Sequence, residues 1–309
     1  MAKKEKEINR EAEVNSDGNR AIVKFRISDF LMMLFIGILS LTCVLPFIHI
    51  AAKSISSNNK VLAKQVYFLP KEFTFDAFVS IFEDATLTYS MVYSVIVTLV
   101  FTLIGMIVCI CGAYPLSKSR LKGRKFFTFI LMVPMYFGAG LIPSYLLFSS
   151  YGLLDNVWVL ILPLVYSAYN LLIMKTFFTS SVPESLEESA FLDGASNIQI
   201  LTKIYLPLSK PILATISLFY AVGRWNAYSD NMYYIRTDKL KMVQYKLYQM
   251  VASAQEAQTA SLAEAAEVTS TPEVLQAAAV MFITIPIICI YPFLQKYFVK
   301  GTMVGAVKG

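Results

Sequence analysis

The stretch from Met91 to Leu116, MVYSVIVTLVFTLIGMIVCICGAYPL, contains no charged side chain. A helix rises about 1.5 Å per residue and the hydrocarbon core of a bilayer is about 30 Å thick, so about 20 apolar residues suffice to cross it. Apolar and polar residues do not alternate along this stretch, as they would in a transmembrane strand. The stretch therefore predicts a membrane-spanning α-helix.

The composition of the whole chain agrees with this prediction. Of 309 residues, 56% are hydrophobic and only 16% are charged, and the mean hydropathy is +0.57. Soluble domains carry about 25% charged residues. A soluble fold of this length would leave large apolar patches in water. The composition thus excludes an ordinary soluble protein and indicates an integral membrane protein.

Six stretches are long and apolar enough to span a membrane. They are residues 30–52, 91–116, 126–148, 157–178, 211–228 and 274–299. The expected fold class is therefore all-α, a polytopic membrane protein with a permease domain over 29–299 between tails 1–28 and 300–309. The first 28 residues are polar and charged, and the first span is too long for the apolar region of a signal peptide. We expect the first span to stay uncleaved.

Positive charge is unevenly distributed between the two sides of this topology. Eighteen of the 27 Lys and Arg residues fall on the side that holds both termini. The positive-inside rule then places both termini in the cytoplasm. The basic pI of about 9.0 reflects topology and contact with the lipid bilayer, so we expect no nucleic-acid partner.

Three loops are long enough to carry structure. Residues 53–90 lie outside and are rich in aromatic side chains, which favours an interfacial helix or cap. Residues 229–273 also lie outside, and their segment 251–267 is rich in Ala, Glu and Gln, a composition that favours an exposed helix. This loop is either a lid or docking surface, or a low-complexity insert. Residues 179–210 lie inside.

Residue patterns typical of catalysis are missing from the sequence. There is no nucleotide-binding loop, no His-Glu-x-x-His and no Cys-x-x-Cys, and only one histidine, His49. The four cysteines lie in apolar runs, which favours free thiols packed among helices. We therefore expect no catalytic residue, no metal and no enzyme. The spans also lack mid-membrane carboxylates, which argues against an ion-coupled transporter or an intramembrane protease.

The inside loop 181–207, SVPESLEESAFLDGASNIQILTKIYLP, is the most informative part of the chain. Ser181 and Glu184 form a predicted capping box that starts a helix, and Ser196 and Gln199 form a second one. Between them, Gly194 is suited to the left-handed conformation that ends a helix. The pattern predicts a helix-glycine-helix elbow at the membrane surface, either a functional element or a peripheral hairpin that covers the bundle.

The same loop resembles a family motif. Glu188-Ser189-Ala190, then Gly194, then Ile204-x-Leu206-Pro207 is similar to the Glu-Ala-Ala loop of binding-protein-dependent ABC importer permeases, with Ser189 in place of the usual Ala. Features outside the loop look like the sugar-uptake branch, above all permeases of complex oligosaccharides: Trp225-Asn226, Pro286, the run 291–298, Lys300-Gly301 and Lys308-Gly309.

The resemblance implies an assembly in the bacterial cytoplasmic membrane. Two six-helix permeases form the pathway, two ATPase subunits bind ATP and Mg²⁺, and an extracellular binding protein delivers the sugar. This chain would hold no cofactor. Its loop would act as a coupling helix in a groove of the ATPase, with acidic side chains pairing with basic residues there. The implied coupling residues are Glu184, Leu186, Glu187, Glu188, Ser189, Ala190, Asp193, Gly194, Ile204, Leu206 and Pro207.

Candidate substrate contacts combine aromatic faces with polar groups, as sugars require. They are Tyr166, Tyr169 and Asn170 in the fourth span and Tyr220, Arg224, Trp225 and Asn226 in or after the fifth. Packing or membrane-interface roles are the alternative for each aromatic residue. Several permeases of this kind leave sugar contact to the partner subunit.

Three other functions remain open. The cargo of a related importer would be an amino acid, a peptide or an inorganic anion, which the sugar-like tail argues against. A membrane enzyme such as a lipid-modifying transferase would need a catalytic cluster, and none is found. A structural membrane scaffold would not need the coupling-loop pattern.

Overall fold

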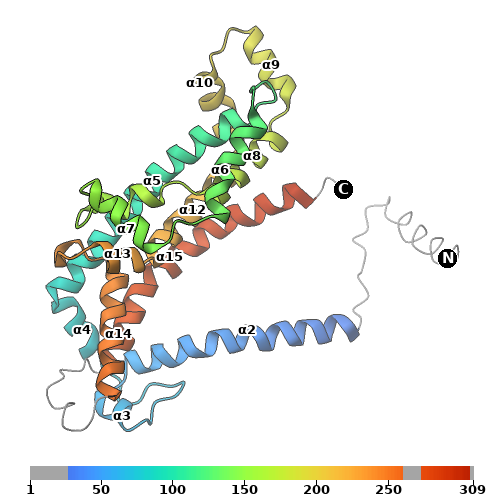
Figure 1. Cartoon of the computed structure of the whole chain (residues 1–309). Helices are drawn as coiled ribbons and strands as arrows, with labels where there is room; N and C mark the ends of the chain where they lie inside the picture. Colours follow the sequence, from blue (N-terminus) through green and yellow to red (C-terminus); the bar gives the residue numbers. More distant parts are fainter. Residues whose placement is uncertain (1–26, 260–272, 307–309) are drawn as a thin grey trace. The chain divides into compact units, whose positions relative to one another are not determined.

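The computed structural model describes residues 27–259 and 273–306, and these are mostly helical (Figure 1). Within these ranges no strand forms, and β-pairing is confined to one isolated bridge between Ser56 and Phe73. The chain divides into two units, residues 1–49 and 50–309. The all-α prediction is confirmed for the described residues.

The described part of the first unit is the start of helix α2 (Ile27–Ser54), which contains the first predicted span. Its side chains are apolar on every face, and residues such as Phe35, Leu39 and Phe47 are exposed. A helix that is hydrophobic all round requires an apolar environment. The last residues of α2 belong to the second unit, where Lys53 pairs with Glu273 at 3.1 Å.

One long uninterrupted helix of the second unit is α5 (Ala85–Ser117). It begins six residues before the predicted span, because Asp84 accepts bonds from the amides of Thr86 and Leu87 and caps the helix. Its 33 residues extend roughly 50 Å at 1.5 Å per residue. Helices α8 (Ala168–Ser181) and α12 (Lys210–Asn226) pack along it.

Two glycines of α5 permit this close packing. A Cβ atom at Gly105 would lie 2.8 Å from the ring of Tyr220 in α12, and one at Gly112 would lie 2.7 Å from Leu171 in α8. Small residues of this kind let helix backbones approach closely in membranes. The side chains of Tyr220 and Leu171 occupy the space that the glycines leave.

The predicted span 126–148 is wrong as a single helix. It consists of α6 (Arg124–Tyr136) and α7 (Leu141–Ser150), which meet at 111°. Pro134 lacks the amide that a continuous helix needs, and Gly140 has φ +86°, which helical residues do not adopt.

The predicted span 157–178 is also interrupted. Short 3₁₀ turns η2 (Val157–Leu160) and η3 (Leu162–Leu164) precede α8, with a bend of 48°. Pro163 lies in this segment, and the side chain of Ser167 accepts the amide of Asn170 and starts α8 as a new helix. Apolar content alone did not reveal this new start.

Short helices gather around the α4 end of α5. They are α3 (Asn58–Leu62) and α4 (Asp76–Glu83) before α5, and α13 (Ser229–Tyr234), η5 (Asp238–Leu240) and α14 (Val243–Thr259) after α12. Helix α15 (Glu273–Ala306) follows and packs against α4, α12 and α14. The predicted helix 251–267 is confirmed as far as Thr259. Its remainder lies outside the described residues.

The opposite end of the second unit carries a compact elbow of short helices (Figure 1). It consists of α9 (Glu184–Leu192), α10 (Asn197–Ile200), the π-turn η4 (Leu201–Tyr205) and α11 (Leu206–Leu208). After Ser209 the chain turns by 85° into α12. In the following, "the elbow" means residues 183–208.

Candidate functional site

The turn at the centre of the elbow is built as the sequence predicts. Gly194 has φ +81°, and its amide donates to the carbonyl of Phe191 at 3.0 Å. The amide of Ala195 donates to the carbonyl of Ala190 at 2.9 Å. These two bonds form a Schellman motif, which satisfies the last carbonyls of α9. The left-handed glycine is confirmed.

The two predicted capping boxes have different outcomes. The Ser196 amide donates to the Gln199 side chain at 2.8 Å, and the Gln199 amide donates to the Ser196 hydroxyl at 3.3 Å, so this box is confirmed. The Ser181–Glu184 box is wrong. Helix α8 continues through Ser181, so Pro183 takes the position before α9, and the Glu184 carboxylate accepts the hydroxyl of Ser119 instead.

A buried ion pair fastens the elbow to the end of α5. The ammonium of Lys118 lies 2.5 Å from the carboxylate of Glu187, and both residues are only 7% exposed. The hydroxyl of Tyr205 donates to the same carboxylate at 2.8 Å, and Arg120 lies 3.4 Å from it. Burial lowers the pKa of Lys118, and the hydrogen bond to Glu187 opposes that shift. Glu187 is thus paired within the chain, and its expected contact with another subunit stays a prediction.

The other coupling residues lie on the surface of the elbow or half-buried beneath it. Leu192 and Ile198, which are not among the implied coupling residues, are the most exposed apolar side chains of the elbow, at 90% and 73%. Ser189 donates its hydroxyl to the carbonyl of Ser185 at 2.9 Å, so replacement of the usual alanine leaves no unpaired group. Glu184, Leu186, Glu188, Ser189, Asp193, Gly194 and Pro207 are exposed, whereas Ala190, Ile204 and Leu206 are half-buried.

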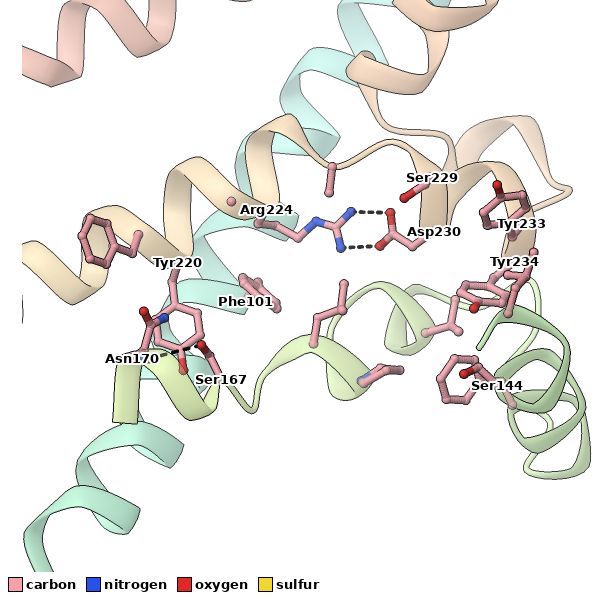
Figure 2. Close-up of a pocket in the computed structure, with 18 residues that line it drawn as sticks. Phe101, Ser144, Ser167, Asn170, Tyr220, Arg224, Ser229, Asp230, Tyr233 and Tyr234 are labelled. Atoms are coloured by element: carbon pink, nitrogen blue, oxygen red, sulfur yellow. Dashed lines mark hydrogen bonds and ion pairs between the residues drawn. The ribbon is translucent and has the colours of Figure 1, made fainter. Parts of the chain in front are cut away.

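A cavity of about 630 Å³ lies between α5, α7, α12, α13 and the segment before α8 (Figure 2). Its wall combines aromatic rings with hydroxyl, amide and charged groups. The aromatic residues are Phe101, Phe148, Phe219, Tyr220, Tyr233 and Tyr234, and the polar ones are Ser144, Ser167, Asn170, Ser229, Arg224 and Asp230. This mixture of ring faces and hydrogen-bonding groups is suited to a polar, ring-shaped ligand.

Arg224 and Asp230 form an ion pair in the wall of this cavity (Figure 2). Arg224 is 1% exposed, and its Nη2 atom donates to Asp230 Oδ1 at 3.0 Å. Nη1 contacts the other carboxylate oxygen at 2.5 Å and donates to the carbonyl of Leu160 at 2.8 Å. The positive charge of Arg224 and the negative charge of Asp230 cancel, so this pair adds no net charge to the cavity wall.

The predicted substrate contacts are only partly brought together. Asn170, Tyr220 and Arg224 line the cavity. The Tyr166 hydroxyl donates instead to the carbonyl of Leu131, and Tyr169 is exposed. The remaining two residues also lie elsewhere: Trp225 is buried beside Val243 and Ile283, and Asn226 is exposed.

Asp230 is the main residue that sequence reasoning missed. A signal was present, because an arginine in an apolar helix needs a counter-charge and Asp230 is the first carboxylate after it. The aromatic lining from Phe101, Phe148 and Tyr234 had no such signal. These residues come from three helices far apart in the sequence.

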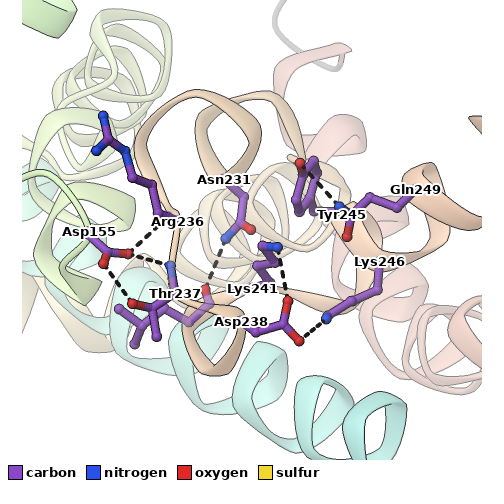
Figure 3. Close-up of polar contacts among 10 residues, drawn as sticks. Asp155, Asn231, Arg236, Thr237, Asp238, Lys241, Tyr245, Lys246 and Gln249 are labelled. Atoms are coloured by element: carbon purple, nitrogen blue, oxygen red, sulfur yellow. Dashed lines mark hydrogen bonds and ion pairs between the residues drawn. The ribbon is translucent and has the colours of Figure 1, made fainter.

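Asp155 holds the segment after α13 through hydrogen bonds to Arg236 and Thr237, a group called the clip below (Figure 3). The carboxylate of Asp155 accepts the amides of Arg236 and Thr237 at 2.9 and 2.8 Å, and the Thr237 hydroxyl at 2.7 Å. These bonds hold the pKa of Asp155 below its usual value. Close by, Asp238 pairs with Lys241 and Lys246, which lower its pKa.

Residues 27–259 and 273–306 contain no group of three His, Cys, Asp or Glu side chains arranged to hold a metal ion.

Comparisons with known proteins give a consistent picture. Residues 106–304 match the family described as the binding-protein-dependent transport system inner membrane component. The chain is 40% identical to the polygalacturonan/rhamnogalacturonan transport system permease protein YtcP of Bacillus subtilis, over 93% of this chain and all of that protein. It is 38% identical to protein LplC of the same organism, over 92% of this chain and 96% of that one.

Two solved structures have the same fold. The first belongs to a bacterial ABC transporter that imports the acidic polysaccharide alginate; it is 33% identical, has a TM-score of 0.79, and the match covers 89% of this chain and 99% of that one. The second, the alginate transporter with a periplasmic protein bound to an alginate pentasaccharide, is 18% identical with a TM-score of 0.59, over 86% and 93% of the chains. From its sequence match over most of its length, this chain belongs to the family of inner-membrane permease components of binding-protein-dependent ABC transporters.

Proposed function

We propose that this chain forms one half of the transmembrane pathway of an ATP-driven importer that takes up an oligosaccharide. Members of the family are transport subunits and not enzymes themselves, and the relative at 40% identity carries the name of a polygalacturonan/rhamnogalacturonan transport system. The structural relative at 33% identity comes from an importer of the acidic polysaccharide alginate. These names support a sugar cargo over the amino acids, peptides and anions that the sequence left open.

The cavity supports the same cargo. Sugar rings stack on aromatic faces and their hydroxyls need hydrogen-bonding partners, and the cavity wall offers both. Asn170 and Ser167 supply polar groups beside the ring of Tyr220 (Figure 2). Because Arg224 is paired with Asp230, an uncharged sugar unit meets no unbalanced charge from this pair.

The contacts between loops support six spans with both termini in the cytoplasm. The two loops expected inside meet each other, since Lys118 pairs with Glu187 and Arg120 donates to Asn197 at 2.5 Å. The two loops expected outside also meet, since Ile81 of α4 lies in one apolar cluster with Leu247 of α14. In this proposal the pairs α6–α7 and η2–α8 each count as one bent span. Basic residues then concentrate on the elbow side, as the positive-inside rule requires.

The observation that carries the proposal is the double-capped elbow. The helix caps on both sides of Gly194 make the elbow a stiff unit that can move as one body. The exposed side chains of Leu192 and Ile198 offer apolar contacts to a partner. We propose that this surface docks on an ATPase subunit, which binds ATP and Mg²⁺. A second permease would complete the pathway, and an extracellular binding protein would dock at the α13–α14 side.

Cross-linking tests the docking. The native cysteines are replaced by serine, Leu192→Cys is introduced, and a cysteine is placed along the expected groove of the ATPase. We expect a cross-link in the assembled complex. Leu62→Cys on α3, whose leucine is also exposed (59%), is the control and should not react with the ATPase. Free labelling of Leu192→Cys in the complete complex, without any cross-link, would show that the elbow does not dock there.

Reporter fusions test the topology. A reporter fused after Lys122 should be active in the cytoplasm, and one fused after Thr259 should lie outside. The reverse result would overturn the placement of every loop.

A further inference from the structure

Two joints connect the elbow to its own flanking helices, and both are bent. Between α8 and α9 the backbone is extended at Val182 and Pro183, with ψ values of 112° and 137°. Between α11 and α12 the chain turns by 85° at Ser209. A bent joint transmits a displacement less directly than a straight helix does, because rotation of its backbone dihedrals can take up part of the movement.

A third connection is not covalent and is far more densely bonded. Besides its ion pair with Glu187, the Lys118 ammonium lies over the rings of Tyr205 and Tyr114, 3.7 and 4.1 Å from their centroids. The Tyr114 hydroxyl donates to the carbonyl of Asn197 at 3.1 Å. Arg120 adds bonds to the elbow, with its guanidinium 4.2 Å from the ring centre of Phe191. Both halves of the elbow, α9 and α10–η4, are thus held at the same point.

The helix at the other side of this connection is long and continuous. Helix α5 runs for 33 residues without a break and is packed against both α8 and α12. Toward its other end, the Ser94 hydroxyl accepts the amide of Val243 at 2.8 Å in a buried setting. Val243 is the first residue of α14, so α5 joins the elbow to the α14 region through direct bonds at both ends.

We propose that Lys118 and Glu187 are positioning residues that transmit movement of the elbow to α5 and through it to α14. This inference rests on the proposed docking of the elbow on an ATPase. Glu187 thereby acts within this chain, while the neighbouring Glu188 is exposed and free to face the partner. Movement passes through the ion pair because it is the stiff connection, and the two bent joints let the elbow keep its fold while α5 moves.

The variants Glu187→Gln and Lys118→Met test this assignment in the complete complex, with both permeases, the ATPases and the binding protein in proteoliposomes. ATP hydrolysis and uptake of a radiolabelled oligosaccharide are measured on the same sample. We expect uptake to fall roughly tenfold or more while hydrolysis changes little, so the ATP used per sugar rises. Lys122→Met, an exposed lysine of the same loop, is the matched control and should leave that ratio unchanged.

A purely structural role predicts a different result. If the pair only stabilised the fold, assembly, hydrolysis and uptake would fall together and the ratio would stay constant, which would overturn the proposal. Lys118→Arg keeps the charge and should restore most uptake, and the exchange variant Lys118→Glu with Glu187→Lys should restore part of it. If either single variant fails to accumulate, the ATP used per sugar in Lys118→Arg and in the exchange variant decides: near-normal coupling in Lys118→Arg with partial coupling in the exchange variant supports the assignment, and any other result contradicts it.

The Leu192→Cys cross-link separates this inference from the proposed function. If the cross-link forms in Glu187→Gln while uptake is lost, docking is intact and transmission is broken, as proposed. If the wild-type elbow does not cross-link at all, the docking proposal has failed. Uptake near the wild-type level in Glu187→Gln, with the cross-link intact, would show that the pair does not transmit movement.

Discussion

Arg224 at the end of α12 and Asp230 in α13 form a two-point ion pair in the wall of an aromatic cavity, although a break in the helix separates them. The arginine is almost fully buried, so its charge depends on this one carboxylate. The same pair holds α13, which forms one side of the cavity, against the end of α12. Stability and cavity shape are therefore linked at this position.

Asp230→Asn should be strongly destabilising, because it leaves the Arg224 charge buried without a counter-charge. Removal of one partner from a buried ion pair costs about 3–5 kcal/mol. Thermal unfolding of the purified protein in detergent measures the loss. Asp238→Asn is the control: its partners Lys241 and Lys246 lie beside an exposed carboxylate, where an ion pair is worth at most about 1 kcal/mol. Equal effects of the two substitutions would contradict the buried-pair interpretation.

Gly105→Ala should push α12 away from α5. The new methyl group would lie 2.8 Å from the Tyr220 ring, and a ring held between helices cannot simply move aside. Overpacking of this kind costs about 1–3 kcal/mol. Gly223→Ala is the matched substitution in α12, where no atom lies within 4 Å of the new methyl group. We expect it to be neutral or stabilising by up to about 1 kcal/mol from helix propensity, so a thermal stability no lower than wild type in Gly105→Ala would refute the close contact.

Gly194→Val should abolish coupling without loss of the protein from the membrane. Its φ of +81° strains any side chain although no atom lies nearby, by roughly 1 kcal/mol or more and most for a β-branched residue. Uptake and sugar-stimulated ATP hydrolysis should fall, while the membrane level stays near normal. Gly194→Ala should be milder and Gly194→Asn milder still, because Asn tolerates this conformation best. Gly37→Val, in an open part of α2, is the control, and full uptake by Gly194→Val would mean that the elbow does not need its turn.

The clip at Asp155 should open only in acid. Its pKa is lowered from 3.8, so the carboxylate favours the folded clip at all pH values above 3.8. That contribution is lost as the pH falls through the lowered folded-state pKa. Hydrogen-exchange protection of the Arg236 and Thr237 amides should therefore stay constant from neutral pH to about 5 and fall below about 4. Asp155→Asn removes the charge while tolerating the positive φ, and should lower protection even at neutral pH.

Several features followed from local sequence alone. The apolar content of 91–116 required a membrane helix, because a chain of that length has no other way to satisfy its backbone in lipid. The turn at Gly194 and the box at Ser196 and Gln199 were also predictable, since both depend on residues within a few positions of each other. The Glu-Ala-Ala pattern identified the family for the same reason.

The predictions that were wrong, of continuous spans and of one capping box, also have physical causes. Apolar content describes burial in lipid but not continuity. Pro134 and Pro163 hint at broken helices in the sequence, but kinks are common in membrane helices, so the prolines alone did not establish the breaks. The Ser181–Glu184 pattern met the spacing of a capping box, yet Ser181 is the last residue of α8 and Pro183 takes the position before α9.

The sequence by itself determined a membrane-embedded helical permease with a capped elbow, because lipid solvation and helix capping act on neighbouring residues. Only the tertiary structure decided the contacts between distant segments: Glu187 turned inward to Lys118 rather than outward, Asp230 met Arg224, and Phe101 and Tyr234 faced one cavity. Such contacts depend on how the helices bend and cross. Pro134 and Gly140 mark in the sequence where the chain can bend, but the 111° and 85° angles that place distant residues side by side are properties of the folded chain.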